Sequence, residues 1–149
     1  MRVAKETHIL FSLSPLCYSL SGPFSFANDA PIISAILTSN PSYLGALQSF
    51  CSYRADIRGI AHDEDLDALR RAYEAEIAKV KADGKEVKFL YMIPDFQNPS
   101  GESMTLEERK MLVDLASRHD FLIVEDSPYR ALRYEGEHIP TMYSLAPDR

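Results

Sequence analysis

The sequence predicts an α/β fold, a parallel-sheet-centred α/β sandwich, on two observations. From residue 31 onward, short apolar runs alternate with longer segments whose apolar residues recur at helical spacing. The helical segments are long enough to cross over between parallel strands, and such crossovers place helices on the faces of the sheet. A chain of 149 residues is sufficient for one domain with a hydrophobic core.

Four short segments are predicted to be strands: residues 31–37, 56–60, 87–93 and 121–124. The polar residues 38–41 bound the first of them. The third has Lys88 as its single charge and ends at Pro94. Apolar runs of this length, with few charges, are typical of strands that are buried on both faces of a parallel sheet.

Three segments are predicted to be helices. Residues 43–53 carry Tyr43, Leu44, Leu47 and Phe50 at spacings of three and four, which describes one helical face. A second helix begins near Asp65 and ends at Gly84, and its apolar residues recur at three- and four-residue steps: Leu66, Leu69, Tyr73, Ile77 and Val80. In the third, Thr105 and Glu108 match a capping box, and the helix ends near His119.

Composition and charge argue against several classes of function. The net charge of −6 argues against nucleic acid as a partner, because a phosphate backbone needs a basic surface. The four histidines are scattered without ligand spacing, so no metal site is predicted. Cys17 and Cys51 lie far apart and form no CxxC pair, which favours free thiols in a reducing cytoplasm.

Residues 1–39 form an atypical N-terminal segment. Its start is basic, residues 9–20 are mostly apolar, and small residues follow, an order that matches a secretory signal peptide within residues 1–27. The apolar stretch is shorter than the roughly 20 residues of a membrane-spanning helix, so no membrane span is predicted. We expect a truncated or wrongly joined N-terminus on a cytoplasmic protein, with export as the alternative if the signal is genuine.

Polar sequences follow two of the predicted strands. Residues 94–101 (PDFQNPSG) follow the third strand, and residues 125–129 (EDSPY) follow the fourth. In open parallel sheets, ligands bind beyond the carboxyl ends of the strands. The sequence therefore predicts that carboxylate, amide and phenol groups gather at that edge.

These residues resemble the large domain of class I/II aminotransferases, which depend on pyridoxal 5'-phosphate (PLP). Asn98-Pro99-Ser100-Gly101 and Asp126-x-x-Tyr129 carry the resemblance, and the fuller strings are similar to the subgroup acting on 2-aminoadipate, aromatic and branched-chain amino acids. Asn40-Pro41-Ser42-Tyr43 also resembles a family segment. The resemblance covers residues 40–149 and implies part of a fold-type I PLP-binding domain.

The resemblance implies a role for each matching residue. Asp126 is expected to face the pyridine nitrogen of PLP, and the carboxylate keeps that nitrogen protonated so that the ring can accept electrons. Asn98 and Tyr129 are expected to hydrogen-bond the phenolic oxygen of the ring. Tyr43 occupies a position where relatives present an aromatic ring to the cofactor. The resemblance implies an amino acid and a 2-oxo acid as substrates. It also implies a homodimer.

Parts of the family pattern have no counterpart in the chain. The lysine that forms the imine with PLP follows the DxxY strand in the family, beyond Arg149 of this sequence. The glycine-containing turn for the cofactor phosphate has no match in residues 1–39. We therefore expect an incomplete piece of the domain, with no catalytic residue of its own and negligible transaminase activity. Borohydride reduction of a protein-bound imine to PLP at a defined lysine would contradict this.

Each site residue also has a structural interpretation. Asp126 and Asn98 suit ordinary turns, Tyr129 suits the core, and Tyr43 suits helix packing. Arg130 and Arg133 are expected at the surface. Two other functions stay open: the effector domain of an aminotransferase-like transcription regulator, which a DNA gel shift tests, and a non-catalytic pseudo-enzyme that contributes half of a dimer interface.

Overall fold

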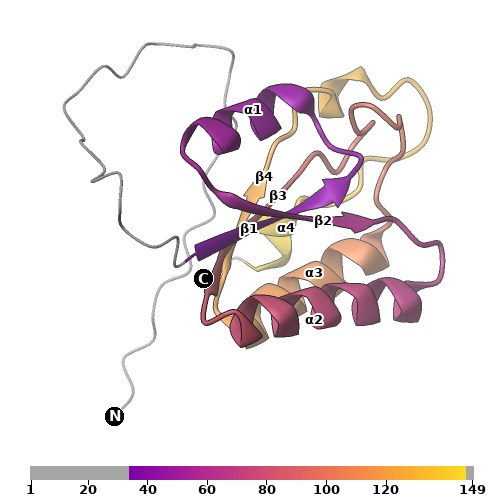
Figure 1. The fold of residues 1–149 in the computed structure, drawn as a ribbon. Coiled ribbons are helices and arrows are strands. Elements are labelled where there is room, and N and C mark those ends of the chain that lie inside the picture. Colours follow the sequence, from indigo (N-terminus) through magenta and orange to yellow (C-terminus); the bar gives the residue numbers. More distant parts are fainter. Residues whose placement is uncertain (1–33, 147–149) are drawn as a thin grey trace.

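The computed structural model describes residues 34–146, and these residues form a parallel sheet between two layers of helix (Figure 1). The sheet has four strands in the order β2-β1-β3-β4, all neighbours being parallel. The predicted fold class is confirmed. In chain order the elements are β1 (Ser34–Asn40), α1 (Leu44–Ser52), β2 (Asp56–Ala61), α2 (Leu66–Ala82), β3 (Glu86–Met92), α3 (Leu106–His119), β4 (Leu122–Glu125), a 3₁₀ turn η1 (Arg130–Leu132) and α4 (Met142–Leu145).

The helices divide between the two faces of the sheet. Helix α1 covers one face, while α2 and α3 lie side by side on the other (Figure 1). The larger core fills the α2/α3 side. The buried apolar residues of α2 and α3 that pack there are Leu69, Tyr73, Ile77, Val80, Met111, Leu112, Leu115 and Ala116. They pack against alternate residues of the central strands, such as Leu37 of β1 and Leu90 of β3.

The first strand extends further than its composition predicts. Thr38 and Ser39, expected to bound the strand, instead pair with Gly59 and Ile60 of β2. Thr38 is buried, and its hydroxyl lies 2.7 Å from that of Ser42. A buried hydroxyl is tolerated in a strand when it has such a partner. The prediction that polar residues end the strand before position 38 was therefore wrong.

The helix boundaries follow the predicted signals. Asp65 caps α2 by accepting from the backbone of Asp67 and Ala68. Just beyond its end, Gly84 adopts a φ of +71°, a conformation that side chains with a Cβ disfavour. At α3, the Thr105 hydroxyl accepts from the Glu108 amide, while the Glu108 carboxylate accepts from the Thr105 amide. The predicted capping box is confirmed.

We expect Thr105→Ala to lower the free energy of unfolding by about 1–2 kcal/mol, because the first turn of α3 loses its side-chain cap. Thr105→Ser is the matched control, since it retains the hydroxyl and is expected to lose much less. Urea denaturation followed by circular dichroism measures both. Equal losses in the two variants would contradict the assignment of the effect to the cap.

A group of charges joins the amino ends of the strands on the α2 side. The Asp56 carboxylate accepts from Arg58 at 2.8 Å and from Lys85 at 2.6 Å. Arg58 also bonds Asp83, beyond the end of α2. Because of the hydrogen bonds from Arg58 and then Lys85, which outweigh the opposing effect of burial, the pKa of Asp56 falls from an ordinary 3.8 to about 2.

This lowered pKa predicts how stability changes with acidity. The folded-state pKa lies below the unfolded one, so the contribution is complete above about pH 4 and disappears as the pH falls through about 2. After allowance for solvent screening we expect roughly 1 kcal/mol. Asp56→Asn should flatten the dependence of the unfolding midpoint on pH in this window. Glu86→Gln, at an exposed position of β3, is the control that should leave it unchanged.

No helix within residues 34–146 combines the length and the apolar character needed to cross a bilayer. The predicted signal-like segment, residues 1–27, lies outside the described residues.

Candidate functional site

Three loops meet at the carboxyl edge of the sheet, the edge where parallel sheets bind ligands. They follow β1, β3 and β4. Side-chain hydrogen bonds connect all three: Gln97 reaches the carbonyl of Pro41, and Asn98 reaches Tyr129. The two polar segments singled out in the sequence are therefore neighbours in space.

Asp126 is held at the end of β4 from two sides. Its backbone N–H donates to the carbonyl of Met92 at 2.9 Å, which ties it to the end of β3. Its carboxylate Oδ2 accepts from the hydroxyl of Tyr91 at 2.8 Å. The ring of Tyr91 is fixed in turn by an edge contact with Phe50 of α1, at 5.5 Å between centroids. Asp126 thus has a defined orientation on the α1 side of the sheet.

The pKa of Tyr91 reflects the groups that lie near its hydroxyl. Burial raises the pKa of Tyr91, and the hydrogen bond to Asp126 raises it further. Smaller contributions in the same direction come from Tyr43 and Tyr129. The Asp126 carboxylate and the hydroxyls of Tyr43 and Tyr129 therefore each lie within electrostatic reach of Tyr91. Two of the tyrosines, Tyr43 and Tyr129, are predicted site residues, whereas Tyr91 is an addition from the structure.

Asn98 and Tyr129 face a common cavity. The Asn98 amide Nδ2 donates to the Tyr129 hydroxyl at 3.4 Å, a long hydrogen bond. The cavity has a volume of about 360 Å³ and is lined by Phe96, Gln97, Asn98, Pro99, Gly101, Tyr129 and Leu132. Gly101 adopts a φ of +78° and closes the turn by donating to the Gln97 carbonyl. Two of the four predicted cofactor residues, Asp126 and Tyr43, do not line this cavity.

Gln97 joins the loop of Asn98 to the loop of Tyr43. Its amide nitrogen donates to the Pro41 carbonyl at 2.8 Å, and its amide oxygen accepts from the Ser100 amide at 2.8 Å. One side chain therefore fixes the NPSG turn and sets its distance from the start of α1. Sequence reasoning did not give Gln97 a role, because nothing local distinguishes it from any other polar loop residue.

Buried charges connect the loop after β3 with helix α3 and with the segment after β4. Asp95 is 1% exposed and accepts from Arg109 of α3 and Arg133 after η1, each at 3.0 Å. Arg133 also lies over the ring of Phe96, 4.9 Å from its centroid. The prediction that Arg133 lies at the surface was wrong, because its side chain is 13% exposed and pairs with a buried carboxylate. Arg130 is half-buried too and donates to the Ile139 carbonyl.

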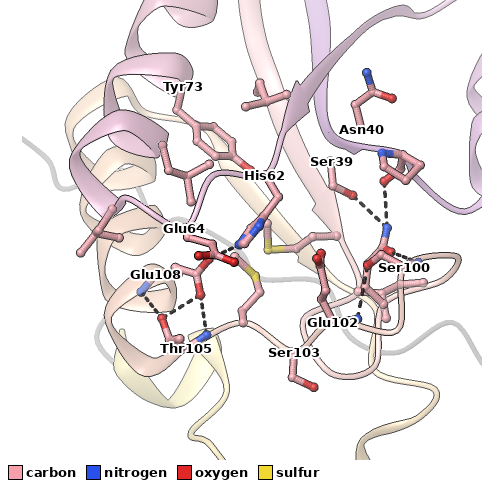
Figure 2. A pocket seen from close by; sticks show the side chains of 18 of the residues that line it. Ser39, Asn40, His62, Glu64, Tyr73, Ser100, Glu102, Ser103, Thr105 and Glu108 are labelled. Carbon is pink, nitrogen blue, oxygen red and sulfur yellow. Dashed lines mark hydrogen bonds and ion pairs between the residues drawn. The ribbon is translucent and has the colours of Figure 1, made fainter.

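A second cavity of about 420 Å³ lies between the ends of β1 and β2 and the starts of α2 and α3 (Figure 2). His62 and Glu108 meet there at 2.9 Å. Burial of Glu108 opposes ionisation, but its hydrogen bonds with Thr105 and His62 lower the pKa overall. None of the four predicted cofactor residues lines this cavity. Residues 34–146 contain no group of three or more His, Cys, Asp or Glu placed to bind a metal.

The chain is similar in sequence to known proteins of one family. The family model for aminotransferase class I and II matches residues 23–148. Aromatic-amino-acid aminotransferase 1 of Thermococcus litoralis is 43% identical over 107 residues, which are 70% of this chain and 25% of that protein. The 2-aminoadipate transaminase of Thermus thermophilus is 34% identical over 116 residues, which are 76% and 27% of the two chains.

Solved structures give the same result. An archaeal alanine:glyoxylate aminotransferase superposes with a TM-score of 0.69 at 38% identity, over 78% of this chain and 29% of that one. The kynurenine aminotransferase of Pyrococcus horikoshii, solved with pyridoxamine phosphate (PMP), superposes with a TM-score of 0.66 at 37% identity, over 75% and 28%. The chain thus spans about a quarter of the length of the curated relatives it matches.

Proposed function

The chain belongs to the class I and II aminotransferase family, and on that premise we propose that its carboxyl edge is part of a PLP site. In this proposal, Asp126 binds the ring nitrogen of the cofactor, and Asn98 and Tyr129 bind the phenolic oxygen. Tyr43 stacks on the ring. The main support is that these groups gather at one edge of the sheet, with Asn98 and Tyr129 in contact.

The chemistry of the donors suits the cofactor. A carboxylate that already has one neutral donor, Tyr91, retains an oxygen for a cationic N–H. An amide N–H and a phenol O–H are both donors suited to an oxyanion on the ring. When bound, PLP supplies an electron sink for bonds broken at the substrate's α-carbon. Asp126 contributes by holding a proton on the ring nitrogen, and Asn98 and Tyr129 by orienting the ring.

For the complete protein we propose transfer of an amino group between an amino acid and a 2-oxo acid. Relatives named for aromatic amino acids, 2-aminoadipate and kynurenine support this class of substrates. We also propose a cytoplasmic homodimer, in which residues 40–149 belong to the large domain. Light scattering of the complete protein tests the dimer.

Binding of PMP to the 149-residue chain tests the cofactor site, because PMP needs no lysine. In ¹⁵N-¹H correlation spectra, we expect saturable shifts centred on the backbone N–H groups around Asn98 and Asp126, namely residues 97, 98, 100, 101, 126, 127 and 129. Asp126→Ala should weaken binding about tenfold or more, since the ring nitrogen loses a charged partner. Asp114→Asn, an exposed carboxylate on α3, is the control and should bind like the wild type.

Two results would overturn the proposed site. One is the absence of saturable shifts at millimolar PMP. The other is a set of shifts centred on His62 and Glu108, which would place the ligand in the second cavity. An analogue of PMP with carbon in place of the ring nitrogen adds an independent check. It should bind the wild type no more tightly than Asp126→Ala, because it has no ring N–H to donate to the carboxylate.

A further inference from the structure

We propose that Tyr91 is a positioning residue of the cofactor site, which acts through Asp126 by holding one carboxylate oxygen and leaving the other to the ring nitrogen. This inference rests on the proposed function. It concerns a residue of the buried strand β3, outside the loops that carry the family's motifs.

The contact itself is specific. The Tyr91 hydroxyl donates to Oδ2 of Asp126 at 2.8 Å, within the range of a strong O–H···O⁻ hydrogen bond. Among residues 34–146, Tyr91 is the one side chain that donates to this carboxylate. Without this hydrogen bond, no side-chain donor would select among the staggered conformations of Asp126 about its Cα–Cβ bond or fix the plane of its carboxylate. The phenol therefore selects one orientation of the carboxylate.

Tyr91 is itself rigidly held. It lies in a central strand, paired with Thr38 on one side and Val124 on the other. It is 3% exposed, and Phe50 packs edge-on against its ring. A backbone hydrogen bond from the Asp126 amide to the carbonyl of Met92, the residue after Tyr91, provides a second connection between Asp126 and β3. A donor on a strand is placed more precisely than a donor on a loop, which is what orientation of a cofactor requires.

The charge states favour the same role. Burial and the adjacent Asp126 raise the pKa of Tyr91, so the phenol keeps its proton and remains a donor across the physiological range. A hydrogen bond to a carboxylate stabilises its ionised form over its protonated form. When Asp126 and the ring nitrogen share one proton, Tyr91 therefore favours the proton on the nitrogen. A residue with a purely structural role would not change where that proton lies.

Tyr91→Phe tests the proposal, because it removes the hydroxyl and keeps the ring. The readout is the ¹⁵N resonance of ring-labelled PMP bound to the 149-residue chain, which reports protonation of that nitrogen. We expect the resonance to move toward that of unprotonated pyridine and the affinity to fall about tenfold. Tyr73→Phe is the matched control, since Tyr73 is also 3% exposed but lies on the α2/α3 side.

The outcomes separate this inference from the proposed function. If the wild type binds PMP but Tyr91→Phe gives the same resonance and affinity, Tyr91 has no positioning role. If the wild type itself gives no saturable shifts around Asp126, the proposed site fails first. If Tyr91→Phe does not fold, 3-fluorotyrosine at position 91 replaces it. Its more acidic hydroxyl should move the resonance toward protonated pyridine, and an unchanged resonance would again overturn the inference.

Discussion

Replacing Arg109 by methionine is expected to lower the free energy of unfolding by about 3–5 kcal/mol, because it leaves a buried carboxylate without one of its two partners. Arg109 is fully buried on α3 and bonds Asp95, which is 1% exposed. One oxygen of Asp95 has no hydrogen-bond partner among the described residues even in the intact protein. Removal of the guanidinium therefore costs more than the loss of an ordinary hydrogen bond.

The guanidinium of Arg109 also donates hydrogen bonds to backbone carbonyls in the loops around the candidate site. It donates to the carbonyls of Pro94 and Met104, at the two ends of the connection between β3 and α3. A third bond reaches the carbonyl of Pro140, just before α4. The Pro94 carbonyl also accepts from the Met104 amide, so the loss falls mainly on the carbonyls of Met104 and Pro140. We therefore expect the methionine variant to lose order in the Asn98 loop as well as stability.

Urea denaturation of the 149-residue chain measures the loss. Arg118→Met is the matched control on the same helix, because Arg118 is 45% exposed and pairs with Asp114 and Glu74 at the surface. Surface pairs of this kind contribute about 0–1 kcal/mol. If the two variants lose the same amount, the charges around Asp95 do not act as a buried cluster.

The sequence was sufficient for the elements whose signals are local. The capping box at Thr105 and the stop at Gly84 depend on residues within one turn of the helix, so the pattern alone placed both boundaries. The run of residues 87–93 likewise identified β3. The end of β1 was misplaced, because Thr38 is accepted in the strand through a partner four residues away.

The candidate site was predictable only in part, because several of its contacts join residues that are far apart in the sequence. Asn98, Asp126 and Tyr129 stand next to prolines and strand ends, where sequence position alone indicates the carboxyl edge. Tyr91 and Arg109 carry no such signal. A tyrosine within an apolar run and an arginine within a helix acquire their partners only when β3, β4 and α3 pack together. For Tyr91, the one available hint was a hydroxyl within the apolar run that follows Lys88.

The second large effect is expected for Leu90→Ala, at about 2–5 kcal/mol. Leu90 is fully buried in β3 and is flanked by Leu37 of β1 and Ile123 of β4, both in the main core. Shortening the side chain removes apolar contacts and leaves a cavity that the paired strands cannot close. Leu44→Ala on α1 is the control, because that leucine is 65% exposed.

The same variant tests whether the two faces of the sheet have separate tasks. Successive residues of a strand point to opposite faces, so Leu90 packs toward α2 and α3 while Tyr91 meets Phe50 of α1. Leu90→Ala should therefore destabilise the fold without disturbing the hydrogen bond from Tyr91 to Asp126. At low temperature and without denaturant, the folded fraction should bind PMP with the affinity of the wild type. A parallel loss of affinity and stability would mean that the candidate site depends on core packing throughout the sheet. In that case Tyr91 would not orient Asp126 independently of the core.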